Sequence, residues 1–360
     1  MNSKNTYKAI GIMSGTSLDG LDMACCQFTK KRKWEFEIQS AKTVKYSREW
    51  RKKLSAAHLL SAEDLLELDA AYGNFIGMCC RDFILKNKIK SVDLLASHGH
   101  TIFHQPEHRF TFQLGSGAAI YAVTGVPVIY DFRGLDVALG GQGAPLVPIG
   151  DRLLFSEYDV CLNLGGIANL SMEKNHERIA FDIAYANMGL NYLAQKNDEE
   201  FDCDGKLAAR GEVDRNLLEK LAAVYQVMRK NRPSLGREGF ELNVLPLLNN
   251  ESIPLENRMR TFCQSIADEI DRSLPREKKR LHMLTTGGGV LNTILIQLLQ
   301  EKLTGIASIV IPIRQTIEFK EALIFAFLGV LRVRGEVNVL KSVTHAVRDN
   351  CSGSILGFKS

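Results

Sequence analysis

The 360-residue chain has an ordinary globular composition, with 45% hydrophobic residues, 24% charged residues and a formal net charge of +4. So small a charge, without a basic tail, argues against nucleic-acid binding but leaves a weakly positive cleft for an anionic ligand open. The longest apolar run, 323–331, is too short to span a membrane, and the polar start at 1–7 shows no export signal. We therefore expect a cytoplasmic protein without a membrane partner. Its eight cysteines lack metal-ligand spacing, which predicts reduced thiols.

Strand-like and helix-like segments alternate along the chain, which predicts an α/β protein. Strands are expected at 7–12 and 22–28 around a Gly/Ser/Thr turn, followed by a helix that Ser61 caps. Two short buried strands follow at 92–96 and 126–130, and each ends in a polar cluster. Open α/β sheets bind ligands at the carboxyl ends of such strands.

A Gly/Pro stretch at 140–148 predicts a hinge, after which strand, glycine turn and strand recur at 160–164 and 167–171. A further strand at 178–181 is expected to end directly before Asp182. The remaining predicted elements are helices at 214–230, 257–273 and 291–304, and strands at 281–284 and 306–311.

This recurrence predicts two similar lobes that face each other. The first lobe would combine residues 1–134 with 318–360, because the segment 318–331 is apolar nearly all round and predicts a buried helix that returns to it. The second lobe would span 135–317 and carry a second phosphate turn, the catalytic carboxylate and the glycines that bind adenosine.

The first glycine turn, in 11–22, reads GIMSGTSLDGLD. Its glycines let backbone N–H groups approach an anion and its hydroxyls add donors, so it can bind phosphate without a lysine. Asp19 and Asp22 are suited to hold Mg²⁺, directly or through water. The alternative is an ordinary β-hairpin turn; a Walker A loop and a dinucleotide fingerprint are both absent. The predicted nucleotide contacts here are Ser14, Gly15, Thr16, Ser17, Leu18, Asp19, Gly20 and Asp22.

Two later glycine segments also predict nucleotide contacts. The turn in 164–169 corresponds to the first turn in the duplicated layout, and 285–289 follows a strand and precedes a helix, whose N-terminus favours phosphate. The alternative for 285–289 is a tight strand–helix connection. The predicted contacts are Gly165, Gly166, Asn169, Gly287, Gly288 and Gly289.

Three polar positions are candidates for catalysis or substrate binding. Asp182, at a strand end, suits a general base, and its alternative is a solvated or capping carboxylate. His100 and His104 have helical spacing, but neighbouring glycine and proline and the lack of an acidic ligand favour hydrogen bonding over metal binding. The guanidinium of Arg133 matches a substrate carboxylate, and its alternative is a structural pair with Asp131.

The chain resembles the anhydro-N-acetylmuramic acid kinases in blocks that lie in order over nearly its whole length. This resemblance implies an actin/hexokinase-like fold that binds ATP and Mg²⁺ in the cleft between its lobes. The blocks are GIMSGTSLDGLD at 11–22, SHGHT at 97–101, HQP at 104–106, DFR at 131–133, GGQGAPLVP at 140–148, NLGGIAN at 163–169, TGGG at 286–289 and FKEA at 319–322.

The reaction that the resemblance implies is hydrolytic ring opening of 1,6-anhydro-N-acetylmuramic acid coupled to phosphorylation at O6, in the recycling of cell-wall fragments. A general base, which maps to Asp182, activates water to attack C1 while O6 takes the γ-phosphoryl group of ATP. The amino sugar is then expected to contact His98, Arg133, Gln142 and Asn187. A homodimer is compatible with the chain.

The chain departs from the family beside the proposed base. The family's Thr-Gly-Pro-Gly is replaced by Ile183-Ala184-Tyr185-Ala186, while Asn187 keeps its place. Losing two glycines and a proline changes the backbone, and the larger Tyr185 is expected to narrow or reshape the sugar pocket. Two alternatives therefore stay open: a kinase for a different amino sugar, and a nucleotide-gated binding protein without turnover.

Overall fold

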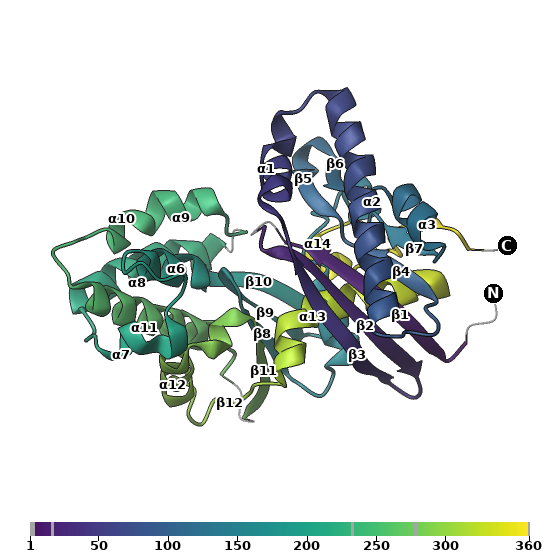
Figure 1. Ribbon diagram of the computed structural model, residues 1–360. Helices are drawn as coiled ribbons and strands as arrows, with labels where there is room; N and C mark the ends of the chain where they lie inside the picture. The colour runs from purple at the N-terminus through teal and green to yellow at the C-terminus, as the bar shows by residue number, and fades with distance from the viewer. Residues whose placement is uncertain (1–3, 16–17, 232–233, 277–279, 359–360) are drawn as a thin grey trace. The chain divides into compact units, whose positions relative to one another are not determined.

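The computed structural model describes residues 4–15, 18–231, 234–276 and 280–358. The chain forms two compact units, Met1–Phe155 with Phe319–Ser360 (unit 1) and Ser156–Glu318 (unit 2). Each unit contains a mixed β-sheet with helices between and beside its strands (Figure 1). The α/β class predicted from the sequence is confirmed.

Unit 1 is built on a six-stranded sheet in the order β13-β7-β4-β1-β2-β3. An antiparallel meander supplies three strands, and β4 and β7 continue the sheet in parallel with β1. The strands are β1 (Thr6–Ser14), β2 (Gly20–Lys30), β3 (Trp34–Lys45), β4 (Leu94–Ser97), β7 (Val128–Tyr130) and β13 (Ser354–Leu356), with a separate hairpin of β5 (His100–Gln105) and β6 (Phe110–Leu114). Its helices are α1 (Arg48–Ala56), α2 (Ala62–Lys86), α3 (Gly117–Thr124), α4 (Gly134–Ala138), α5 (Val147–Leu154), α14 (Lys341–Thr344) and most of α13 (Arg314–Arg334).

Two helices form the core of unit 1 together with its strands. Helix α2 begins after Ser61, whose hydroxyl accepts the Asp64 N–H as the sequence predicts, and it buries Leu68, Tyr72 and Ile76. Helix α13 crosses β1 at Gly11, where a Cβ atom would lie 1.7 Å from the Ala322 carbonyl oxygen. Only glycine permits so close an approach, so Gly11 fixes where the buried helix lies on the sheet.

Unit 2 repeats the same pattern with a five-stranded sheet in the order β10-β9-β8-β11-β12. Here too an antiparallel meander is followed by two parallel strands. Its strands are β8 (Val160–Leu164), β9 (Ile167–Lys174), β10 (Glu177–Tyr185), β11 (Leu281–Thr286) and β12 (Ala307–Val310). The helices are α6 (Asn187–Gln195), α7 (Lys206–Ala209), α8 (Arg215–Asn231), α9 (Arg237–Asn243), α10 (Leu245–Leu248), α11 (Leu255–Ser273) and α12 (Thr293–Lys302).

The repeated order confirms the prediction of two similar lobes, but the boundary between them differs from the prediction. Unit 1 extends to Phe155 rather than to residue 134. The reason is that α5 packs within unit 1, where Asp151 forms a buried ion pair with Lys320 of α13 at 2.8 Å and the ring of Phe155 lies 5.2 Å from that of Phe36. The Gly/Pro stretch at 140–148 is therefore internal to unit 1, and the chain passes to unit 2 after it.

Two predicted strands are longer in the structure than in the sequence analysis. Strand β10 continues to Tyr185, so Asp182 lies inside it and does not follow it. Strand β11 likewise includes Thr286, because its end still pairs with β8. Among the described residues, no helix has the length and apolarity needed to cross a membrane.

Candidate active site

In unit 2 the second glycine turn is joined to the start of α6. The turn connects β8 to β9 and contains Gly165 and Gly166, whose carbonyl groups accept the N–H groups of Asn187 and Met188 at 3.0 and 3.1 Å. The Asn187 amide also donates to the Leu164 carbonyl at 3.1 Å. Asn187, predicted as a substrate contact, therefore ties this turn to the helix.

The glycines after β11 lie against the same turn. Gly287 has a φ of +86°, and a Cβ atom there would lie 2.7 Å from both the Leu164 carbonyl oxygen and Asn163 Oδ1. A Cβ on Gly289 would lie 3.2 Å from Asn187 Oδ1. The two glycine segments, far apart in sequence, thus meet around Asn187.

Part of this glycine surface is open. A Cβ atom on Gly166 would meet no atom within 4 Å, and one on Gly288 would meet only Asn187 Nδ2, at 3.5 Å. Bare backbone with free space in front of it is what a phosphate or ribose needs for close approach. The residues present therefore fit a nucleotide.

Asp182 lies next to this turn in the sheet. Its Cα partner on β9 is the predicted contact Asn169, and the strand register shifts between Asp182 and Ala184. The Leu235 N–H donates to Asp182 Oδ2 at 2.9 Å. Burial raises the pKa of the Asp182 carboxyl above its ordinary value, and the Leu235 hydrogen bond partly opposes this by stabilising the ionised form. A half-buried carboxylate with a raised pKa is suited to accept a proton.

A small pocket opens beside Asp182 and is walled by charged groups. Arg229 of α8 and Arg272 of α11 both line it, and both ion-pair with the buried carboxylate of Glu269. The other lining residues are Phe181, Ile183 and Ser273. Because Glu269 holds both guanidinium groups, they are part of a structural network that sequence reasoning did not anticipate.

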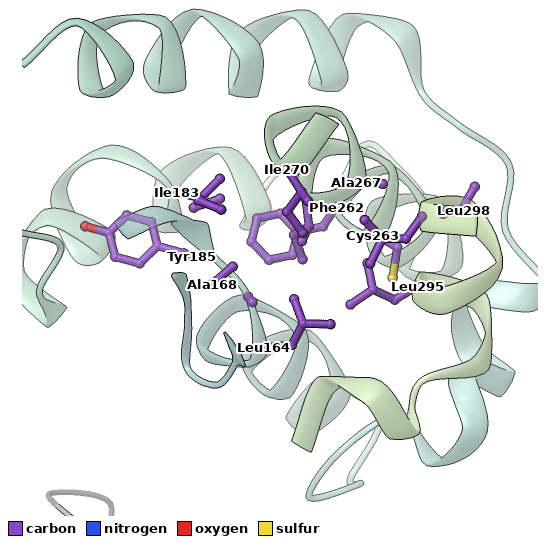
Figure 2. Close-up of a cluster of buried hydrophobic side chains, with 14 of the residues drawn as sticks. Leu164, Ala168, Ile183, Tyr185, Phe262, Cys263, Ala267, Ile270, Leu295 and Leu298 are labelled. Carbon is purple, nitrogen blue, oxygen red and sulfur yellow. The ribbon is translucent and has the colours of Figure 1, made fainter. Parts of the chain in front are cut away.

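The departure from the family sequence is buried. Ile183, Ala184, Tyr185 and Ala186 are all at most 3% exposed, and Figure 2 shows Ile183 and Tyr185 in the hydrophobic cluster with Phe262. The Tyr185 side chain is therefore buried and does not itself narrow an open pocket, whereas its effect on the shape of the sugar pocket stays a prediction. Its ring packs against Phe240, with ring centres 5.4 Å apart, and not toward solvent.

In unit 1 the first glycine turn is supported from inside by hydroxyl groups. Ser14 is 2% exposed, and its Oγ accepts from the Tyr46 hydroxyl at 2.7 Å and lies 2.9 Å from His100 Nδ1. Burial lowers the pKa of His100 to about 4, so its ring is neutral near pH 7. The Ser14 hydroxyl, predicted to contact phosphate, is thus already occupied by protein groups.

The rest of the first turn is only partly described. Gly15, Leu18 and Gly20 are described, with Leu18 in the left-handed region at a φ of +59°, whereas Thr16 and Ser17 lie outside the described residues. Of the two predicted metal ligands, Asp19 is exposed and Asp22 is half-buried, accepting the Thr43 hydroxyl at 2.5 Å. Among the described residues, no group of three His, Cys, Asp or Glu side chains is arranged to hold a metal ion.

The structure brings together two predicted substrate contacts, His98 and Arg133. His98 Nδ1 lies 2.9 Å from the Gly99 carbonyl, so it carries the proton, and Nε2 accepts from Arg133 Nε and Nη2 at 3.2 and 2.8 Å. Burial and the Arg133 charge hold the pKa of His98 well below its ordinary value. Arg133 Nη1 also donates to the Gly143 carbonyl at 2.6 Å. No hydrogen bond joins the remaining guanidinium N–H groups to the part of the chain that the structure describes.

A buried aspartate holds the loop that completes this arrangement. Asp136, fully buried, accepts the Gly143 N–H at 2.8 Å and the hydroxyl of Thr344 at 2.9 Å. The Gln142 N–H donates to the Thr344 carbonyl. The Gln142 side chain, which was predicted to contact the substrate, is exposed.

Glu321, to which sequence reasoning gave no role, lies close enough to Arg133 and Asp22 for their charges to interact with its carboxylate. Partial loss of hydration raises the pKa of its carboxyl, Arg133 lowers it, and the negative charge of Asp22 raises it. Loss of hydration also lowers the pKa of Arg133 to about 10, against the opposing effect of Glu321, so the guanidinium stays charged near pH 7. The only sequence signal for Glu321 was its place in the FKEA block.

Comparison with known proteins agrees with this geometry. Residues 7–357 match the family model described as anhydro-N-acetylmuramic acid kinase. The chain is 32% identical to an anhydro-N-acetylmuramic acid kinase from Sulfurimonas denitrificans, covering 96% of this chain and 98% of that one, and 31% identical to one from Vibrio vulnificus, covering 97% of both.

Among solved structures, one match is (R)-2-hydroxyglutaryl-CoA dehydratase component A from Acidaminococcus fermentans, with 11% identity, a TM-score of 0.46, and coverage of 89% of this chain and 96% of that one. The two units share one order of five strands, to which unit 1 adds β13 at the edge of its sheet. The family match extends over nearly the whole chain. The chain belongs to the anhydro-N-acetylmuramic acid kinase family.

Proposed function

We propose that the protein uses ATP to open 1,6-anhydro-N-acetylmuramic acid and phosphorylate O6, giving N-acetylmuramic acid 6-phosphate. The observation that carries the proposal is the Asp182 carboxylate, half-buried on β10 next to the glycine turn with one oxygen held by the Leu235 N–H. In this family, that position is the expected base. Membership of the family supports ATP-dependent sugar kinase chemistry, and the identity of the substrate as the anhydro sugar is the more specific part of the proposal.

Asp182 is proposed to remove a proton from the attacking water. Because Oδ2 accepts the Leu235 N–H, and no hydrogen bond joins Oδ1 to the described residues, Oδ1 is the oxygen that accepts this proton. The water oxygen then bonds to C1 and the C1–O6 bond breaks. O6 receives the γ-phosphoryl group as the bond from that group to ADP breaks, and ADP leaves. The carboxylate gains one proton in this step and releases it to solvent afterwards. Bound ATP with Mg²⁺ supplies the phosphoryl group and neutralises its charge.

The nucleotide is proposed to bind the glycine surface of unit 2. Gly166 and Gly288 are the positions where the backbone is open to a ligand. Mg²⁺ typically keeps several waters and uses one or two protein carboxylates together with substrate phosphates. Asp22 and Asp19 fit this mode of binding. Glu321 lies close enough to Asp22 for the negative charge of Asp22 to raise the pKa of the Glu321 carboxyl.

Arg133 is proposed to bind the carboxylate of the muramic acid lactyl group. Neutral His98 and the Gly143 carbonyl fix the guanidinium while leaving other N–H groups for the ligand. A positioned guanidinium recognises a planar carboxylate through paired hydrogen bonds. A sugar that lacks this carboxylate is expected to bind less tightly.

The proposal is tested by incubating the protein with ATP, Mg²⁺ and a panel of amino sugars. Mass spectrometry should show a product of the anhydro sugar heavier by one phosphoryl group (HPO3) and one water, with one ADP formed per product. N-acetylmuramic acid and N-acetylglucosamine should give little ADP. If a sugar without the anhydro bridge is phosphorylated in preference, the protein is a kinase for a different amino sugar. If the protein binds nucleotide but forms no ADP with any sugar, it is a nucleotide-gated binding protein without turnover.

The structure weakens the original reason for the alternative sugar. That reason was the altered segment 183–186, of which Ile183 lines the pocket beside Asp182, whereas Ala184, Tyr185 and Ala186 are buried and do not line it. The proposed substrate is accordingly the one that the family uses.

A further inference from the structure

The segment 235–240 is attached to β10 at three points. The Leu235 N–H donates to Asp182 Oδ2 at 2.9 Å, and the next residue, Gly236, accepts the Tyr185 hydroxyl through its carbonyl oxygen at 3.1 Å. Phe240, on the first turn of α9, packs edge-on against the Tyr185 ring. Two of the three attachments are made by Tyr185, one of the four residues that depart from the family motif.

We propose that Tyr185 is a positioning residue for the base: it holds the Leu235–Gly236 backbone against β10, so that the Leu235 N–H stays directed at Asp182. This inference rests on the proposed function, because it concerns the base of that reaction. Tyr185 does not touch substrate, since it is 1% exposed, and it acts only through the backbone that it holds.

The geometry explains how the large Tyr185 can occupy the position where the family motif has proline. After the register shift at Asp182, Ala184 and Tyr185 still pair with Ala168 and Ile167 of β9. Bulges of this kind redirect the side chains that follow them. The Tyr185 side chain reaches the segment before α9 instead of an open surface. Its ring fills the space next to Phe240, and its hydroxyl fixes the adjacent backbone.

The hydrogen bond from Leu235 has two consequences for Asp182. It restricts rotation of the carboxylate, so that Oδ1 is presented in one direction, and it stabilises the ionised form. The other titratable groups near Asp182 are Arg229 on α8, Arg272 on α11 and the Tyr185 hydroxyl itself, with Glu269 pairing both arginines. None of the hydrogen bonds or ion pairs that the described residues form joins these arginines or Glu269 to Gly236, so we expect a change at the Tyr185 hydroxyl to leave them in place.

The test compares two tyrosines that pack on the same ring. Tyr185→Phe removes only the hydroxyl that holds Gly236, whereas Tyr192→Phe removes a hydroxyl that bonds Asn249, while the Tyr192 ring also packs on Phe240. Losing a hydrogen bond to an ionised group shifts its pKa by up to about one pH unit. We therefore expect the acidic limb of kcat/KM for Tyr185→Phe to move to higher pH by up to about one unit, and that of Tyr192→Phe to stay at the wild-type position.

A second measurement does not depend on activity. Hydrogen–deuterium exchange of the peptide containing Leu235 should be faster in Tyr185→Phe than in wild type and unchanged in Tyr192→Phe. As a direct removal of the donor, Leu235→Pro should reproduce the pH shift, because proline has no N–H. If Leu235→Pro fails to fold, the exchange measurement on Tyr185→Phe still decides.

The outcomes separate this inference from the proposed function. If Asp182→Asn retains turnover, Asp182 is not the base and the proposed function loses its mechanism. If Asp182→Asn is inactive but Tyr185→Phe has the wild-type pH profile and exchange rate, only the role of Tyr185 is overturned. A shifted profile with faster exchange, absent from Tyr192→Phe, supports it.

Discussion

Replacing Asp182 with asparagine should abolish turnover without lowering stability. Asparagine has the same shape and keeps a carbonyl oxygen for the Leu235 N–H, so the local structure should persist. It cannot accept the proton from water. General-base catalysis contributes about 10²–10⁴-fold, so kcat should fall by at least that range, or about 3–5 kcal/mol in activation free energy.

The expected effect on stability follows from the sign of the pKa change. Burial raises the pKa of Asp182 in the folded protein, so the group stabilises the fold only below its unfolded pKa, and this contribution is lost as the pH rises through the folded pKa. At pH 7 the buried negative charge is therefore a net cost to folding. Asp182→Asn removes that charge and should leave the melting temperature unchanged or slightly higher.

The assay is ADP release with the anhydro sugar, together with calorimetric titration of an ATP analogue and a thermal melt. Asp198→Asn is a matched control, because Asp198 is an exposed aspartate of the same unit. It should behave as wild type in all three measurements. Near-wild-type kcat in a folded Asp182→Asn protein would refute the assignment of the base, and a loss of several degrees in melting temperature would refute the argument from burial.

Three further predictions concern other parts of the structure. Gly166→Val should fold normally, because a Cβ there meets no atom within 4 Å, but should weaken binding of an ATP analogue in calorimetry; unchanged affinity would remove this turn from the nucleotide site. Arg133→Met should raise KM for the anhydro sugar far more than it changes ATP affinity, and an unchanged KM would contradict carboxylate binding. Lys320→Met removes the ion pair with the buried Asp151 carboxylate and should lower the free energy of unfolding in urea by about 3–5 kcal/mol. A loss below about 1 kcal/mol would contradict a large contribution from this ion pair.

The sequence determined the fold class and the order of elements because both depend on local patterns. Alternating strand and helix patterns and two recurring glycine turns predicted two similar α/β lobes, and the sheet orders confirm them. The apolar segment from residue 318 predicted the buried helix α13, and its contact with Gly11 places it in unit 1. Boundaries were less accurate, since the end of β10 and the boundary at Phe155 depend on pairing and packing with residues distant in sequence.

The surroundings of the candidate residues could not be predicted from the sequence. That Gly166, Asn187 and Gly287 meet in one place depends on β8 pairing with β11, which no local pattern encodes. The sequence likewise placed Ser14 among the phosphate contacts, whereas the folded chain surrounds its hydroxyl with Tyr46 and His100.

Tyr185 shows most clearly what each level decides. From the sequence alone, a tyrosine in place of a small residue next to the base predicted a reshaped sugar pocket. Only the tertiary structure gave the direction of its side chain, because the register shift at Asp182 and the ring of Phe240 direct it into the interior. The sequence determined which residues are available for chemistry, through their types and order. Tertiary packing decided which of them face a ligand and which support those that do, since side-chain direction depends on contacts between segments far apart in the chain.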